Sequence, residues 1–238
     1  MVVLSTNIAC RYQTRQADRR FRTMQIAIIG AGNVGRALAT SLTRAGHQVT
    51  VAAEHAEHAR EAADQAGATA AASSSDAASA ADLVVLAVPS AALDQIAAEL
   101  GSTLRGKVVV DVTNRPTPDA SGPSTSIAEE LQSKLPEAKV VKAFNTVFAS
   151  RQAQPAVAGI APDGYVASDD EAAKQTVLDV VESLGFRPVD AGSLAAARTL
   201  EGMAWLNIQR NLAGGTWQDA WVLVGPEMVS ATTAGSRN

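Results

Sequence analysis

Three glycines at fixed spacing are the residues of this chain best suited to binding chemistry. Gly30, Gly32 and Gly35 form a G-x-G-x-x-G turn between an apolar run at 26–29 and a helical pattern. Such a turn lets the backbone approach a pyrophosphate, and the helix behind it directs free N–H groups at the phosphates. The pattern predicts a dinucleotide site, with a ligand-free glycine-rich turn as the alternative. The candidate residues are Gly30, Ala31, Gly32, Asn33, Val34 and Gly35.

An acidic residue stands at the far end of the same stretch. Glu54 follows a second apolar run at 49–53 and lies 24 residues after Gly30. At this spacing a carboxylate accepts hydrogen bonds from the ribose hydroxyls of a bound dinucleotide. Ala53 and Glu54 therefore join the candidate cofactor-binding residues.

The elements that must position these residues alternate along the chain. Apolar runs predict strands near residues 25–29, 48–52, 83–88, 107–112, 139–143, 164–168 and 186–190. Helical patterns lie near residues 33–45, 55–66, 76–80, 91–100, 124–134, 170–184 and 194–212. Residues 68–81 are rich in Ala and Ser, and we expect a short strand and a helix there. The alternation predicts an α/β fold, namely a Rossmann-type doubly wound, mostly parallel sheet with a short C-terminal helical extension.

Further candidates follow the predicted strands, because ligands bind beyond the carboxyl ends of an open parallel sheet. Val88 and Pro89 are expected to form a wall beside the adenosine and pyrophosphate. Polar side chains after later strands can hydrogen-bond the nicotinamide ribose and carboxamide, although Asn and Thr also serve in turns and caps. The additional candidates are Ala87, Val88, Pro89, Thr113, Asn114 and Asn145, with Thr146 beside them.

Composition restricts the class of partner. The 238 residues are 47% hydrophobic and carry a net charge of −4, which gives no reason to expect nucleic acid or an anionic membrane surface. Cys10 is the only cysteine, so no disulfide can form within the chain. No apolar run approaches the length that crosses a bilayer. We expect a cytoplasmic protein that acts on a small molecule.

Three segments are expected. Residues 1–23 hold five arginines and one acid, and are interpreted as a disordered extension, with a basic targeting segment as the alternative. Residues 24–190 form the predicted dinucleotide-binding domain. Residues 191–238 form a C-terminal helical segment that completes a second-substrate pocket or a dimer interface. Segments 114–123 and 152–164 are expected to be loops.

The order of motifs resembles the F420-dependent NADP oxidoreductase family over nearly all of residues 24–225. The same pattern is similar to the oxidoreductase domains of STEAP metalloreductases. The matching blocks are GAGNVG, LVVLAVP, DVTN, VVKAFNT and FRPVDAGSLAAARTLE. The resemblance implies hydride transfer between a nicotinamide and a flavin-like ring, which is coenzyme F420 in the namesake enzymes and a flavin in the metalloreductases. It also implies a homodimer whose cavity is shared between the two subunits.

One departure from the family pattern concerns the cofactor. Members that use NADP carry a Ser-Arg pair after the second strand, where this chain has Ala53 and Glu54. A glutamate repels a 2′-phosphate and favours a free 2′-hydroxyl, so we predict NAD(H) over NADP(H). Positive charge from nearby side chains is the alternative. Those side chains are Arg36, His55, His58 and Arg60.

No catalytic side chain is predicted, because hydride transfer between stacked rings depends on positioning. The chain shows no Tyr-x-x-x-Lys pair and no lysine after residue 190. No metal site is expected: His55 and His58 are three residues apart, but no third ligand accompanies them, which favours a solvated helix face. His47, before the second strand, is interpreted as structural.

The C-terminal part carries the residues whose roles stay open. Trp205, Trp217 and Trp221 form a ring-binding wall, a dimer contact or core. Arg198 is expected to pair with Glu201 at i, i+3, or to meet an anionic tail of the second substrate. Two other functions are compatible with these residues, namely reduction of a small imine or carbonyl compound and non-catalytic sensing of the dinucleotide.

Overall fold

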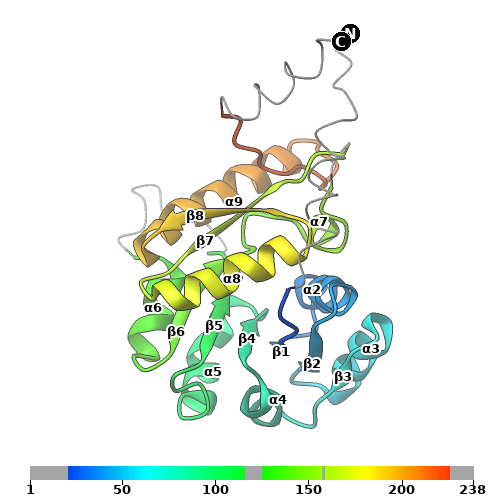
Figure 1. Ribbon diagram of the computed structural model, residues 1–238, viewed down its shortest axis with the longest axis vertical. Helices are drawn as coiled ribbons and strands as arrows, with labels where there is room; N and C mark the ends of the chain where they lie inside the picture. Colours follow the sequence, from blue (N-terminus) through cyan, green and yellow to red (C-terminus); the bar gives the residue numbers. More distant parts are fainter. Residues whose placement is uncertain (1–20, 116–124, 157–158, 226–238) are drawn as a thin grey trace.

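The computed structural model describes residues 21–115, 125–156 and 159–225. Most of the extension predicted at 1–23, and parts of both predicted loops, lie outside these residues. The described chain forms an eight-stranded sheet in the order β3-β2-β1-β4-β5-β6-β7-β8 (Figure 1). Its strands are β1 (Gln25–Ile29), β2 (Gln48–Ala52), β3 (Thr69–Ala70), β4 (Leu83–Leu86), β5 (Val108–Asp111), β6 (Lys139–Ala143), β7 (Asp163–Ala167) and β8 (Arg187–Gly192).

The helices follow the strands in turn, as the alternation predicts. They are α2 (Asn33–Arg44), α3 (Ala56–Ala66), α4 (Ser74–Ala80), α5 (Leu93–Leu100), α6 (Ile127–Lys134), α7 (Ala149–Ala153), α8 (Glu171–Ser183) and α9 (Ala197–Leu212), with the 3-10 turns η1 (Ser90–Ala92) and η2 (Leu194–Ala196). The short strand and helix expected within 68–81 are β3 and α4, so that prediction is confirmed. Helix α7 falls inside the predicted loop 152–164 and the residues just before it, and is an addition.

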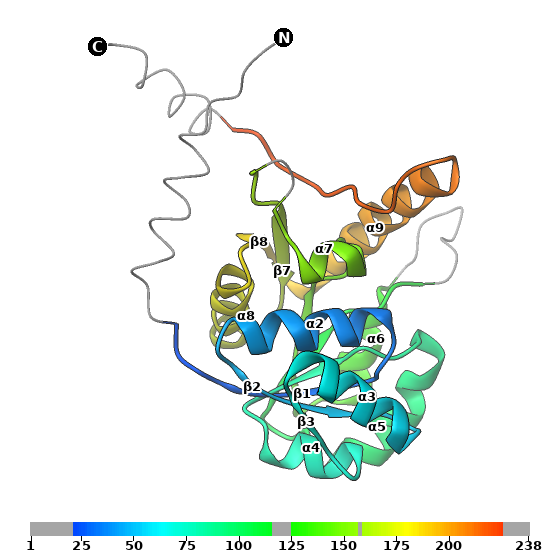
Figure 2. The same ribbon diagram turned by 90° about the vertical axis from the view of Figure 1, so that its right-hand side faces the viewer.

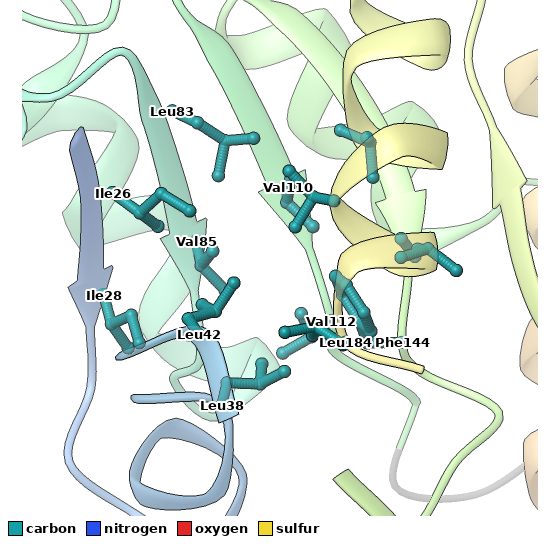
Figure 3. Close-up of a cluster of buried hydrophobic side chains, with 14 of the residues drawn as sticks. Ile26, Ile28, Leu38, Leu42, Leu83, Val85, Val110, Val112, Phe144 and Leu184 are labelled. Carbon is teal, nitrogen blue, oxygen red and sulfur yellow. The ribbon is translucent and has the colours of Figure 1, made fainter. Parts of the chain in front are cut away.

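Helices cover both faces of the sheet (Figures 1 and 2). On one face, α2, α3 and α8 pack onto the sheet through buried apolar residues. Figure 3 shows Leu42 of α2 beside Val85, and Leu184, which follows α8, beside Val112 and Phe144. On the other face, α4, α5 and α6 pack onto a second cluster of buried strand residues. Leu194 and Ala197, at the start of the C-terminal helical part, belong to this second cluster. The predicted Rossmann-type sheet with a C-terminal helix is confirmed.

The direction of the strands sets where a ligand can bind. Strands β1 to β6 pair in parallel, whereas β7 runs antiparallel to β6, and β8 is parallel to β7. The carboxyl ends of β1, β2, β4, β5 and β6 therefore share one edge of the sheet. The loops that carry the predicted site residues all leave the sheet at this edge.

None of the described helices is both long and apolar enough to traverse a bilayer.

His47 joins the turn before β2 to α8. Its Nδ1 accepts a hydrogen bond from the Met24 amide at 3.3 Å, and its Nε2 lies 3.0 Å from Ser183 Oγ. Because Nδ1 accepts, the neutral ring donates from Nε2. Burial lowers the pKa of His47. The structural role expected for this histidine agrees with these contacts.

Acid should therefore destabilise the fold through His47. At pH values below the ordinary histidine pKa of about 6.5, the unfolded chain binds a proton at His47 that the folded protein does not bind. The free energy of unfolding therefore decreases as the pH falls, until the pH is below the lowered pKa of the folded protein. Denaturant unfolding from about pH 7.5 to about pH 5 would measure this loss in wild type and His47→Gln. We expect the stability advantage of wild type to narrow as the pH falls. An advantage that is constant across the range would contradict the assignment.

Candidate functional site

A cleft of about 610 Å³ opens over the carboxyl ends of β1, β2 and β4. Eight of the predicted residues line it, namely Gly30, Ala31, Gly32, Ala53, Glu54, Ala87, Val88 and Pro89. Helix α5 closes one side with Gln95, Ile96 and Glu99. The remaining turn candidates, Asn33, Val34 and Gly35, form the first turn of α2, just behind the cleft.

Two of the glycines allow the turn to pack. Gly30 has a φ of +117°, and a Cβ there would lie 2.2 Å from the Ala87 carbonyl oxygen. A Cβ on Gly35 would lie 2.0 Å from the Gly30 carbonyl oxygen, so glycine lets α2 approach the end of β1. Side chains larger than hydrogen are excluded at both positions by the protein itself.

Gly32 differs from these two. An ideal Cβ built on it has no heavy atom within 4 Å, and its φ of −75° and ψ of −173° suit any residue. The space beside Gly32 belongs to the cleft, where the N-terminus of α2 begins. The protein's own packing leaves this cradle open, and its size and backbone N–H groups fit a pyrophosphate.

The end of the cleft that follows β2 contains one carboxylate and two imidazoles. Glu54, His55 and His58 are exposed and line the cleft, and the two histidine rings meet edge to face at 5.3 Å. Arg36 is engaged elsewhere, because its guanidinium donates to the Ala31 carbonyl and pairs with Glu61 at 3.1 Å. The histidines are therefore the basic side chains that line this part of the described cleft.

The second group of predicted residues lies at the ends of β5 and β6. Asn145 Nδ2 donates to Asn114 Oδ1 at 2.9 Å, and Asn114 Nδ2 donates to the Asn145 carbonyl at 3.1 Å. Within the part of the chain that the structure describes, Thr113 Oγ1 and Asn145 Oδ1 are buried without a hydrogen-bond partner. Buried polar atoms are ordinarily satisfied, so this pair fits a polar ligand such as a nicotinamide carboxamide or ribose.

An unusual backbone conformation orients Asn145. Phe144, which precedes it, has a φ of +61°, which is uncommon for a bulky residue. Its carbonyl accepts a hydrogen bond from the buried Gln152 Nε2 at 2.8 Å, and its ring contacts Phe186. Helix α7, which carries Gln152, thus helps to hold this strained turn in place.

A buried charge cluster behind these residues was missed by the sequence reasoning. Lys142 is fully buried, and its ammonium lies 2.8 Å from Asp111 Oδ2 and 3.1 Å from Glu201 Oε1. Burial raises the pKa of Glu201, and the Lys142 charge opposes that shift. The single lysine within the otherwise apolar strand of VVKAFNT is the sequence feature that could have indicated a buried charge.

The expected pairing within α9 is wrong. Arg198 binds Glu129 on α6 through two hydrogen bonds of 2.8 and 2.5 Å, whereas Glu201 faces Lys142. The Arg198 guanidinium, with hydrogen bonds from Ser126, lowers the pKa of Glu129 to about 2. Glu129 also completes a capping box at the start of α6, which fixes it where Arg198 can reach it.

The three tryptophans lie around the C-terminal part and none is fully buried. Trp205 and Trp221 are half-buried, whereas Trp217 is exposed and packs edge to face against Phe148 at 5.2 Å. Trp217 has a φ of +57°, and its amide donates to Asn211 Oδ1. This geometry is against a core role for Trp217 and leaves the ring-binding and interface interpretations.

Comparison with protein families matches residues 25–115 to the family described as "NADP oxidoreductase coenzyme F420-dependent". The matched residues run from β1 to four residues beyond β5 and include the glycine turn, Glu54 and Thr113. Among solved structures, the chain is similar to a putative F420-dependent NADP-reductase from Arthrobacter sp. FB24. The two share 31% identity and a TM-score of 0.76, over 85% of this chain and all of that one.

Two curated relatives are also similar. Metalloreductase STEAP3 of Rattus norvegicus is 32% identical over 182 residues, which is 74% of this chain. The F420-dependent NADP reductase of Methanocaldococcus jannaschii is 31% identical over 140 residues, or 55% of this chain. The matches span 36% of the metalloreductase and 62% of the NADP reductase.

Proposed function

The chain belongs to the F420-dependent NADP oxidoreductase family, and from that membership we propose that it transfers a hydride between a nicotinamide dinucleotide and a flavin-like or deazaflavin acceptor. The observation that carries the proposal is the cleft at the carboxyl edge of the sheet, with an open cradle at Gly32 and two unpaired polar atoms beyond it. A pyrophosphate would fit the open cradle, and a carboxamide or ribose would satisfy the two polar atoms.

Each part of the edge would hold one part of the dinucleotide. The Gly32 backbone and the first N–H groups of α2 would bind the pyrophosphate, and Glu54 would accept from the ribose hydroxyls. Val88 and Pro89 would form the wall beside the adenosine. Thr113 and Asn145 would bind the nicotinamide carboxamide or ribose through their unpaired oxygens.

When bound, a nicotinamide ring supplies or accepts the hydride, so the protein has no difficult proton transfer to carry out. Its contribution is to hold two rings in contact and to exclude water from between them. The predicted absence of a catalytic side chain agrees with this division of labour. Residues 191–238, with α9, would complete the pocket for the second ring.

We propose NAD(H) as the preferred cofactor, because a carboxylate at residue 54 opposes a 2′-phosphate. The relatives are named for NADP, so the preference is a proposed departure of this chain from them. Glu54→Arg should tighten NADPH binding at least about tenfold, which is about 1.4 kcal/mol, and weaken NADH binding. Titration by nicotinamide fluorescence would measure both dissociation constants.

A matched control separates local from general electrostatics. Glu57→Arg makes the same charge change three residues further along the chain, on an exposed residue of α3 outside the cleft lining. It should leave the ratio of the two dissociation constants close to that of wild type. If wild type already binds NADPH more tightly than NADH, the preference for NAD(H) is wrong, and His55 and His58 become the candidates for phosphate recognition.

The acceptor is tested by turnover. Reduced dinucleotide should be mixed with oxidised F420, FMN, FAD and ferric chelates, and its oxidation followed by absorbance. Turnover with a flavin or deazaflavin supports the proposal. Tight cofactor binding without turnover by any acceptor would favour a sensor, and turnover only with an imine or carbonyl compound would favour the small-substrate alternative.

We also propose a homodimer formed through the C-terminal part. Large apolar side chains are exposed on α9 and along the segment that follows it, including Leu206, Leu212, Trp217, Leu223 and Val224. Such a group is typical of an interaction surface. Light scattering at several concentrations would test it, and a monomer throughout would reject it. The cytoplasmic location stays a prediction.

A further inference from the structure

A single ammonium group lies where four elements of the site meet. Lys142, near the end of β6, is fully buried and donates to Asp111 Oδ2, Glu201 Oε1 and the Thr113 carbonyl oxygen. The last of these bonds measures 2.5 Å. Asp111 ends β5, Glu201 belongs to α9, and Thr113 is a candidate nicotinamide-binding residue in the loop after β5.

Stability alone is a weak reason for such a cluster. Desolvating three charged groups is costly, and apolar residues of the same volume often serve a core equally well or better. Apolar residues such as Val140 and Leu131 are buried on this same face of the sheet. A positional role for the cluster is therefore indicated by the groups that it contacts.

The cluster holds both backbone polar groups of Thr113. The amide of Thr113 donates to Asp111 Oδ1 at 2.9 Å, while its carbonyl accepts from Lys142. The backbone is thus satisfied from behind. Only the Thr113 hydroxyl, buried without a partner among the described residues, is left for a ligand.

The same cluster fixes α9 through Glu201. Glu201 Oε1 accepts from Lys142 and from the Ile127 amide at the start of α6, the latter at 2.9 Å. Its other oxygen lies 3.9 Å from Arg115 Nε. Helix α9 is consequently connected to the Thr113 loop through two charged side chains, Glu201 and Lys142.

We propose that Lys142, with Asp111 and Glu201, is a positioning residue. It aligns the candidate nicotinamide-binding residues Thr113 and Asn145 with α9, and so sets the distance between the nicotinamide and the acceptor ring. The inference rests on the proposed function, which assigns the two rings to these two sides. Lys142 touches neither ring; it acts through the Thr113 backbone and through Glu201.

The test removes only the contact of the cluster with α9. Glu201→Met eliminates this contact and leaves the Lys142–Asp111 pair intact, whereas Glu201→Gln keeps a hydrogen-bond acceptor of the same shape. Lys139→Met, on the same strand, breaks only a partly exposed pair with Asp170 and serves as the control. All four proteins are measured for NADH dissociation constant, thermal midpoint and single-turnover oxidation of bound NADH by the acceptor that wild type uses best.

Glu201→Met should slow hydride transfer about 10- to 100-fold, since a misplacement of about 1 Å has that order of effect. Its NADH dissociation constant should change less than about threefold, which is below 0.7 kcal/mol. Glu201→Gln should recover most of the rate, and Lys139→Met should match wild type. A lower thermal midpoint with an unchanged rate in Glu201→Met would reduce the cluster to a structural role and overturn the proposal, as would a loss of NADH affinity equal to the loss of rate.

A second measurement needs no turnover. Amide hydrogen exchange should show that NADH protects α9 as well as the 113–115 loop in wild type and Glu201→Gln, whereas Glu201→Met should lose the protection of α9 alone. Equal protection of α9 in all three proteins would overturn the alignment. If none of the acceptors tested supports NADH oxidation by wild type, the proposed function fails. The hydrogen-exchange pattern then still tests whether Glu201 couples α9 to the cofactor site.

Discussion

Gly32→Ala should weaken NADH binding about 100-fold or more, a loss of about 2.7 kcal/mol, while leaving the fold unchanged. The added methyl meets no heavy atom of the protein within 4 Å, so it occupies only the space of the ligand. Two effects of the substitution on the free energy of unfolding nearly cancel. Alanine restricts the backbone of the unfolded chain, which stabilises the protein by about 0.4–1 kcal/mol. Alanine is also a poorer N-cap than glycine, which destabilises it by a comparable amount.

The other glycines supply the contrast. Gly35→Ala places its methyl against the Gly30 carbonyl oxygen and should destabilise the ligand-free protein by about 1–3 kcal/mol. Gly202→Ala, at an exposed position of α9 with open space around its Cβ, should leave NADH binding as in wild type. Calorimetric titration and thermal unfolding of the three variants measure both quantities. Wild-type affinity in Gly32→Ala would show that the pyrophosphate does not approach this turn.

Lys142→Met should destabilise the protein by about 3–5 kcal/mol, because it leaves two buried carboxylates without their shared cation. The methionine fills most of the volume of the lysine, so the loss is electrostatic in origin. Denaturant unfolding measures it, and Lys139→Met, whose pair is partly exposed, should change the free energy of unfolding by less than about 1 kcal/mol.

Neutralising the carboxylates checks the cause of that loss. In the Lys142→Met background, Asp111→Asn and Glu201→Gln together should restore much of the stability, since no unpaired charge then remains. A Lys142→Met protein as stable as wild type would mean that water or a rearranged Arg115 already compensates the two acids. A loss that neutral partners do not repair would point to packing.

The strands were predictable because their signal is local. Continuous apolar runs such as Leu83–Leu86 are buried on both faces of the sheet and carry their own boundaries. Helix α7 has five residues, ASRQA, which is too short to show a helical period. It forms because Gln152 finds the Phe144 carbonyl, a contact with a strained turn that no local pattern reveals.

The candidate site divides in the same way. The residues of the glycine turn and Glu54 could be predicted to share one cleft, because each follows a parallel strand directly. The contact between Lys142 and Glu201 could not be predicted, because these two residues meet only after α9 packs on α6. The pairing of Arg198 with Glu201 failed for the same reason: Glu129, already fixed by its capping box, offers Arg198 a two-bond partner on the neighbouring helix.

The two outermost strands of the described sheet have features that oppose pairing with another sheet. On one side β3 has only two residues, and on the other β8 carries Pro188, which has no N–H, and the charged Arg187 and Asp190. Short or charged edges of this kind resist pairing with strands of another chain. The described sheet therefore offers other chains little template for edge-to-edge pairing, so the proposed homodimer would form through side-chain contacts elsewhere on the surface.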